Sequence, residues 1–90
     1  MRTIKVEYDL NKPGQDYEPL IERIKGMGSW CHVLKSSWIV KTDLSAPAVR
    51  DDLKQCMDPS DDLLVVDMTG DMWASAGLSS EINEWLKSNV

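Results

Sequence analysis

Hydrophobic and polar side chains alternate at the start of the chain. In residues 3–10 the hydrophobic positions recur at every second residue: Ile4, Val6 and Tyr8. This alternation is typical of a strand with one buried face. Pro13-Gly14 then predicts a turn. We therefore expect a first strand that carries Asp9 at its far end, next to a loop.

The spacing of the hydrophobic residues becomes helical after this loop. From residue 16 onward they recur three or four positions apart, at Tyr17, Leu20, Ile21, Ile24 and Met27. Asp16 is expected to be the N-cap of this helix, and Gly26 or Gly28 to end it. A second helix is expected over residues 46–57 with Ser45 as its N-cap, and a last one from Ser79 or Ser80 to Ser88.

Three further segments predict strands. Residues 30–36 and 38–42 are rich in β-branched and aromatic residues, and form either a tight hairpin or one long bent strand. Residues 62–68 contain the run Leu63-Leu64-Val65-Val66, which predicts burial on both faces and a central position in the sheet. The resulting order is β-α-β-β-α-β with a terminal helix. This order predicts a single ferredoxin-like α+β domain over residues 1–90, with two helices on one face of a four-stranded antiparallel sheet.

The other face of this sheet is not expected to be wholly solvated, because the strands carry large apolar groups on both faces. The first strand would contribute Lys5, Glu7 and Asp9 to it. The second strand would add one of two alternating sets, either Trp30, His32 and Leu34 or Cys31, Val33 and Lys35. The third strand would likewise add either Trp38 and Val40 or Ile39 and Lys41. Either a second copy of the chain covers this face, or the last helix folds back over it with Trp85 and Leu86. The favoured interpretation is a two-fold homodimer.

Composition narrows the class of protein. The 90 residues carry fifteen acidic and ten basic side chains, a net charge of -5, which argues against strong non-specific DNA binding. No apolar run approaches the ~18 residues that a membrane span needs, and no signal segment opens the chain. Cys31 and Cys56 are expected to be free thiols in a reducing compartment. We therefore expect a cytoplasmic protein without membrane contact.

Few side chains suggest chemistry. No P-loop, GxGxxG, HExxH or GxSxG motif is present, so nucleotide hydrolase, dehydrogenase, zinc protease and esterase functions lack support. The candidates are Asp9, a carboxylate at a strand end, His32, the one histidine, and the hydroxyls of Ser36 and Ser37. The pairs Asp51-Asp52 and Asp61-Asp62 are interpreted as a solvated helix face and a turn. Trp38 or Trp73 offers a ring on which a nucleobase would stack.

Three features carry a family resemblance: the β-α-β-β-α-β order over about residues 1 to 68 and two short stretches within it. Tyr8-Asp9-Leu10 is similar to the strand ending Tyr-Asp-Ile of the small CRISPR-associated endoribonucleases that act with the spacer integrase, and of the related virulence-associated protein D toxins. Residues 32–38 resemble the pattern Arg-x-Gln-x-Ser-Val-Phe of the same family. Ser36 takes the serine position and Trp38 the phenylalanine position. His32 stands where the family has arginine, and Leu34 where it has glutamine.

The resemblance implies a function and a cofactor. It implies a homodimer in which Asp9 of both chains binds Mg²⁺ or Mn²⁺ and phosphodiester bonds of RNA are hydrolysed, supported by His32, Ser36 and Ser37. The alternative is a non-catalytic dimeric binding or scaffold protein of a CRISPR-like, toxin–antitoxin or phage-defence system. The acidic surface of such a protein would meet a basic protein partner.

Overall fold

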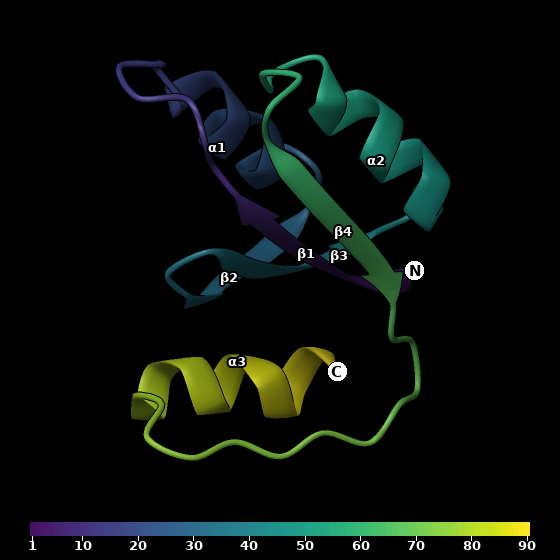
Figure 1. Cartoon of the computed structure of the whole chain (residues 1–90). Coiled ribbons are helices and arrows are strands. Elements are labelled where there is room, and N and C mark those ends of the chain that lie inside the picture. The colour runs from purple at the N-terminus through teal and green to yellow at the C-terminus, as the bar shows by residue number, and fades with distance from the viewer.

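The computed structural model describes residues 1–90 and confirms the predicted order of elements (Figure 1). The elements are β1 (Arg2–Asp9), α1 (Glu18–Lys25), β2 (Ser29–Leu34), β3 (Ser37–Thr42), α2 (Ala46–Lys54), β4 (Asp62–Asp67) and α3 (Ser80–Asn89). The strands pair antiparallel throughout, in the order β2-β3-β1-β4. The chain therefore has a ferredoxin-like α+β fold with an additional C-terminal helix, and β2 and β3 form a hairpin.

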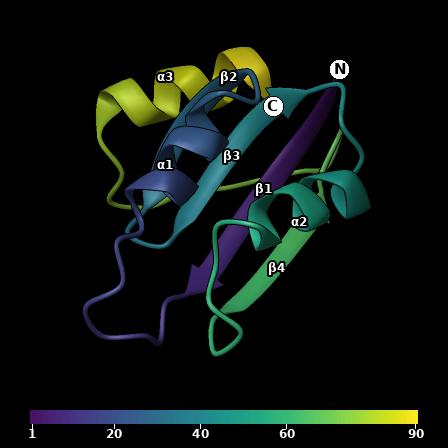
Figure 2. The same ribbon diagram turned by 90° about the horizontal axis from the view of Figure 1, so that it is seen from above.

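The elements form three layers. Helices α1 and α2 lie on one face of the sheet and α3 on the other (Figures 1 and 2). The core fills the space between the sheet and the first two helices, and comprises Ile4, Val6, Tyr8, Leu20, Ile24, Trp38, Val40, Val49 and Leu53. The indole N–H of Trp38 donates to the Tyr8 hydroxyl at 2.9 Å, so these buried polar atoms satisfy each other. None of the three helices is long and apolar enough to cross a bilayer.

The predicted N-cap is confirmed at α2 but is wrong at α1. The Ser45 hydroxyl accepts from Ala48 N–H at 3.3 Å, which confirms the predicted N-cap of α2. The predicted N-cap Asp16 is wrong, because the cap position of α1 is Tyr17. The Asp16 carboxylate instead accepts from Glu18 N–H at 3.0 Å, an Asx turn that precedes the helix. After α1 the chain enters β2 at Gly28, where a Cβ would collide with the main-chain oxygen of Lys41.

The predicted central position of β4 is wrong. This strand pairs with β1 alone and is one edge of the sheet. Leu63 and Val65 pack against the core under α2, but Leu64 and Val66 are 59% and 40% exposed on the other face. An uninterrupted apolar run shows that both faces are apolar, but it does not show that both are covered. Here the second face of β4 is free because α3 lies over β2 and β3 (Figure 2).

Helix α3 covers half of the second face within the same chain. Its Leu86 is only 3% exposed, and Cys31 and Ile39 of the facing strands are also buried. The Trp85 indole N–H donates to the Ser29 hydroxyl at 3.2 Å. Of the two predicted ways to cover this face, the return of the last helix therefore holds over β2 and β3. The homodimer remains a prediction for the half formed by β1 and β4.

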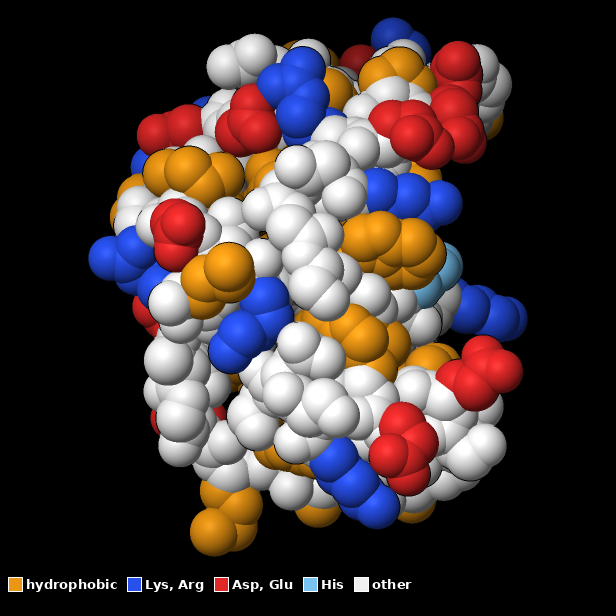
Figure 3. Space-filling model, turned by 180° about the vertical axis from the view of Figure 1, so that it is seen from behind, with side chains coloured by type: hydrophobic (Ala, Val, Ile, Leu, Met, Phe, Trp, Pro, Cys, Tyr) orange, Lys and Arg blue, Asp and Glu red, His pale blue; other side chains and the backbone are white.

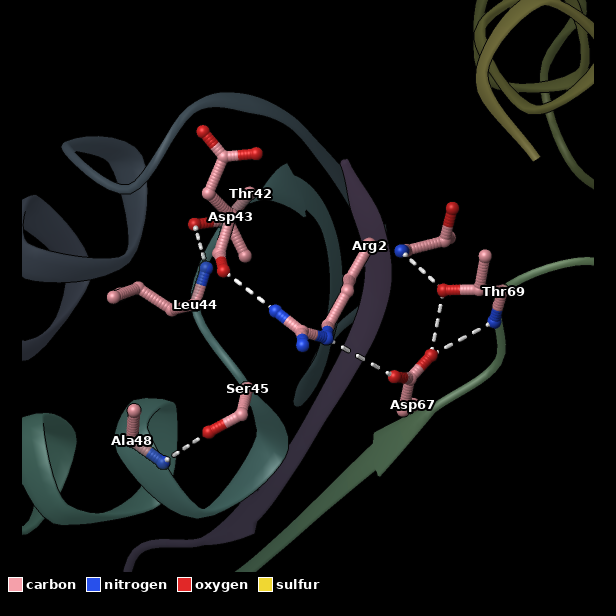
Figure 4. A network of polar contacts seen from close by, with 9 residues as sticks. Arg2, Thr42, Asp43, Leu44, Ser45, Ala48, Asp67 and Thr69 are labelled. Carbon is pink, nitrogen blue, oxygen red and sulfur yellow. Dashed lines mark hydrogen bonds and ion pairs between the residues drawn. The ribbon is translucent and has the colours of Figure 1, made fainter.

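A polar network ties the start of β1 to its neighbours (Figure 4). Arg2 donates from Nη1 to the carbonyl oxygen of Asp43 at 2.7 Å and pairs with the Asp67 carboxylate at 3.8 Å. Thr3 N–H donates to the Thr69 hydroxyl at 2.9 Å, and this hydroxyl donates to Asp67 at 2.6 Å. The hydrogen bonds from Thr69, with a smaller contribution from the charge of Arg2, lower the pKa of Asp67. The network holds the register of β1 against β4, which determines the geometry at the other end of this strand pair.

Candidate functional site

Two carboxylates meet at the far end of the β1–β4 pair. The register places Asp9 directly opposite Asp62. Residues directly opposite on antiparallel strands project to the same face, with Cβ atoms about 4.5–5.5 Å apart. Both side chains are exposed. The structure thus supplies two neighbouring carboxylates from a single chain.

A cleft of about 370 Å³ surrounds these carboxylates and is lined by Glu7, Tyr8, Asp9, Ser36, Ser37, Asp62, Leu63 and Leu64. The turn between β2 and β3 reaches the cleft because Tyr8 N–H donates to the carbonyl oxygen of Ser36 at 3.1 Å. Ser37 follows at the start of β3, where it pairs with Glu7 in the β1–β3 register. Three of the four predicted site residues, Asp9, Ser36 and Ser37, therefore line one cleft.

Glu7, the third carboxylate of the cleft, already has a partner. The Lys5 ammonium lies 2.7 Å from its carboxylate. The hydrogen bond from Lys5 lowers the pKa of Glu7; burial opposes this effect, and the charge of Lys5 and a hydrogen bond with Ser37 add to it. Glu7 is therefore ionised at pH 7, and the positive charge of Lys5 balances its negative charge. Asp9 and Asp62 remain as the carboxylates without a cationic partner.

Asn11 joins the loop ends that carry the two aspartates. Its side-chain amide donates to the carbonyl oxygens of Asp9 and Ser60 at 3.3 and 2.8 Å, and to the Asp62 carboxylate at 3.2 Å. Its main-chain N–H donates to the Asp61 carboxylate at 2.7 Å. These bonds hold the ends of β1 and β4 together.

His32 does not reach the cleft. Its ring stacks on Trp38 with the centroids 4.0 Å apart and the planes 7° from parallel. Trp38 belongs to the core beneath α1 and α2, whereas Asp9 projects from the opposite face of the sheet because it is one residue beyond the core residue Tyr8. Within one chain the structure therefore does not bring His32 to Asp9, and a catalytic role of His32 stays a prediction. The expected alternative of Cys31 and Ile39 on the second face is the one that the structure adopts.

Asp62 is the site residue that sequence reasoning missed. The pair Asp61-Asp62 was interpreted as a turn, and this holds for Asp61 alone, which accepts from the Tyr17 hydroxyl at 2.6 Å and from Asp58 N–H at 2.9 Å. Asp62 begins β4, in agreement with the strand expected over residues 62–68. The predicted fold class already implies that Asp62 lies near Asp9, because the first and last strands of this fold lie side by side and antiparallel. The end of one must then meet the start of the other.

The donor set of the cleft fits a hard divalent cation. No three His, Cys, Asp or Glu side chains converge into a ready-made metal cage anywhere in the chain. Structural zinc sites use four such ligands and catalytic zinc sites three, whereas the cleft offers the two free carboxylates of Asp9 and Asp62. Mg²⁺ is bound by one or two carboxylates together with water and substrate phosphates, and Mn²⁺ also prefers oxygen ligands. Asp9 and Asp62 satisfy this requirement if a phosphate supplies the remaining oxygens.

Fold and cleft together define a ferredoxin-like α+β domain with a pair of carboxylates at the end of its sheet. Comparison of the chain with protein-family models, with curated proteins and with solved structures gave no match. A function must therefore be inferred from the geometry of the cleft and from the residues that line it.

Proposed function

We propose that this protein is a Mg²⁺-dependent endonuclease that hydrolyses phosphodiester bonds of RNA. The observation that supports this most directly is the register of Asp9 opposite Asp62, beside the hydroxyls of Ser36 and Ser37, in one open cleft. The resemblance of Tyr8-Asp9-Leu10 to the metal-binding strand of the CRISPR-associated endoribonucleases supports the same proposal. Mn²⁺ is expected to replace Mg²⁺.

Each residue has a separate role in this proposal. Asp9 and Asp62 would hold the cation, and a cation held there would stabilise negative charge on a phosphoryl oxygen and lower the pKa of a coordinated water. The Ser36 hydroxyl donates a hydrogen bond to a phosphate oxygen, and the Ser37 hydroxyl does so when it turns from Glu7 to the phosphate, so that together they orient the bond to be cleaved. The pair of Lys5 with Glu7 keeps a third free negative charge away from the phosphate. The second carboxylate comes from the same chain, so two Asp9 side chains need not meet across a dimer.

The nuclease proposal is tested with structured and single-stranded RNA in Mg²⁺, Mn²⁺ or chelator. Asp9→Asn and Asp62→Asn should each reduce the cleavage rate at least about 100-fold, because even the outer partners of metal ligands contribute about 10–100-fold. Asp71→Asn is the matched control, since Asp71 is exposed and lies outside the cleft. Cleavage that persists in both cleft variants, or that is indifferent to chelator, would contradict the proposal.

We also propose that the protein is a cytoplasmic homodimer that associates through the uncovered half of the sheet. Leu64 and Val66 support this because they expose apolar surface on an edge strand, a position that soluble proteins normally protect. The same observation favours a second candidate function, a non-catalytic dimeric scaffold of a defence or toxin–antitoxin system. Sedimentation and the cleavage assay together separate the two: a stable dimer that never cleaves RNA would support the scaffold.

A further inference from the structure

A stack of aromatic rings reaches the surface at the β2 edge of the sheet, away from the cleft. Trp38 at the bottom of this stack is 2% exposed, whereas His32 above it is an exposed residue. Trp30 leans against the same buried indole, with centroids 5.4 Å apart and planes tilted by 54°, and is 40% exposed. The surface at this edge is thus aromatic, although the protein as a whole is acidic.

The imidazole of His32 is held in a defined orientation. One face lies against Trp38, with centroids 4.0 Å apart. Its Nε2 lies 3.1 Å from the carbonyl oxygen of Lys35, and because a carbonyl only accepts, Nε2 carries the hydrogen in this contact. No strand lies beyond β2. The outer face of the ring is therefore exposed and already oriented, so a flat ligand would stack on it at little entropic cost.

Two lysines flank these rings without a carboxylate partner. The Lys25 ammonium lies 5.0 Å from the centroid of the Trp30 ring, a cation–π contact. Lys35 follows His32 in the turn that ends β2. Neither lysine takes part in any of the five ion pairs of the protein. Figure 3 shows the histidine, in pale blue, between blue basic side chains and next to orange hydrophobic ones.

We propose that His32, Trp30, Lys25 and Lys35 form a binding site for a single-stranded stretch of RNA. An unpaired base stacks on the outer face of His32, and the two lysines neutralise the phosphates beside it. Aromatic platforms flanked by cations are how proteins hold single strands, because every base has a π-face while a duplex hides it. The choice of RNA over another single-stranded polyanion rests on the proposed function.

The position of the turn connects this surface to the cleft. Lys35 belongs to the stacking site, and the next residue, Ser36, lines the cleft on the other face of the sheet. A strand that passes around this turn would contact both. A base held by His32 would bring a phosphodiester a few nucleotides further along toward Asp9, because Asp9 lies two strands and three residues away from His32. The net charge of -5 agrees with a local site of this kind, because the rest of the surface would repel a nucleic acid.

The test is the binding of a fluorescently labelled 12-nucleotide oligouridylate, measured by anisotropy in chelator so that cleavage does not interfere. His32→Ala should weaken binding about 5- to 150-fold, the range for one base stacked on an aromatic ring. His32→Phe keeps a ring that stacks and should retain most of the affinity. Lys25→Ala and Lys35→Ala should each reduce the slope of log affinity against log salt by about 0.7. Lys87→Ala, an exposed lysine on α3, is the matched control and should bind like the wild type.

Three results would overturn the inference: no binding by the wild type, unchanged binding by His32→Ala, or equal loss in His32→Ala and His32→Phe while both variants retain the wild-type circular dichroism spectrum. The outcomes also separate this site from the proposed function. Cleavage that depends on Asp9 in a protein whose binding ignores His32 would reject the stacking site alone. Binding through His32 without cleavage that depends on Asp9 would reject the nuclease alone.

Discussion

The substitution Asp9→Asn should have opposite effects on stability with and without a divalent cation. It removes one of two negative charges that the β1–β4 register sets opposite each other. Opposed like charges on neighbouring strands destabilise by roughly 0.2–1 kcal/mol, and Coulomb's law in water gives about 0.8 kcal/mol at ~5 Å. The only bond to Asp9 outside the ladder uses its main-chain oxygen, so asparagine loses no side-chain partner. In chelator the variant should therefore be more stable, by about 0.5 kcal/mol.

Mg²⁺ should reverse this order. A cation that binds only the folded protein at ten times its dissociation constant adds about 1.4 kcal/mol. In a domain of this size, each kcal/mol raises Tm by about 4–8 °C, so the wild type should gain roughly 6–11 °C. Asp9→Asn, with one carboxylate left, should gain little.

The assay is thermal unfolding followed by circular dichroism at a series of Mg²⁺ concentrations and in chelator, with Asp71→Asn as the matched control. The control should shift with Mg²⁺ as the wild type does. An equal Mg²⁺ shift in Asp9→Asn would show that the cation binds elsewhere. A variant that is less stable than the wild type in chelator would show that Asp9 stabilises the strand end in a way that repulsion does not describe.

Three further predictions concern stability and association. Hydrogen bonds from Ser60, supported by Lys12, lower the pKa of Asp58 from 3.8 to about 2. A carboxylate whose pKa is lower in the folded than in the unfolded protein stabilises the fold above the unfolded pKa, and this contribution is lost as the pH falls through the folded pKa. The difference in urea midpoint between wild type and Asp58→Asn should therefore shrink between pH 4 and pH 2. Leu86→Ala should weaken the docking of α3 by about 2–5 kcal/mol, which hydrogen exchange would detect as faster exchange in α3 than in the sheet. Leu64→Lys should change monomer stability by no more than about 0.5 kcal/mol because the side chain is exposed, yet it should dissociate the proposed dimer in sedimentation; an intact dimer would exclude this face as the interface.

Local patterns along the chain are enough to predict the elements and their order. Alternation in residues 3–10, helical spacing from Tyr17 and the capping hydroxyl of Ser45 depend on contacts within a few residues, so they can be read locally. Asp9 at a strand end belongs to this group, as do Ser36 and Ser37 at the hairpin turn. The ferredoxin-like fold followed because few arrangements accommodate this order of strands and helices.

Long-range packing determines which residues meet and which faces of the sheet remain free. Side chains on a strand point alternately to the two faces of the sheet, so the sequence left open which face His32 occupies. Its stacking on Trp38 shows that His32 lies on the face opposite to Asp9. The pairing of Asp9 with Asp62 depends on the register between β1 and β4, the first and the last strand along the chain. The exposure of Leu64 depended on where α3 docks. Each of these outcomes arises from contacts between distant segments, which local hydrophobic patterns do not encode.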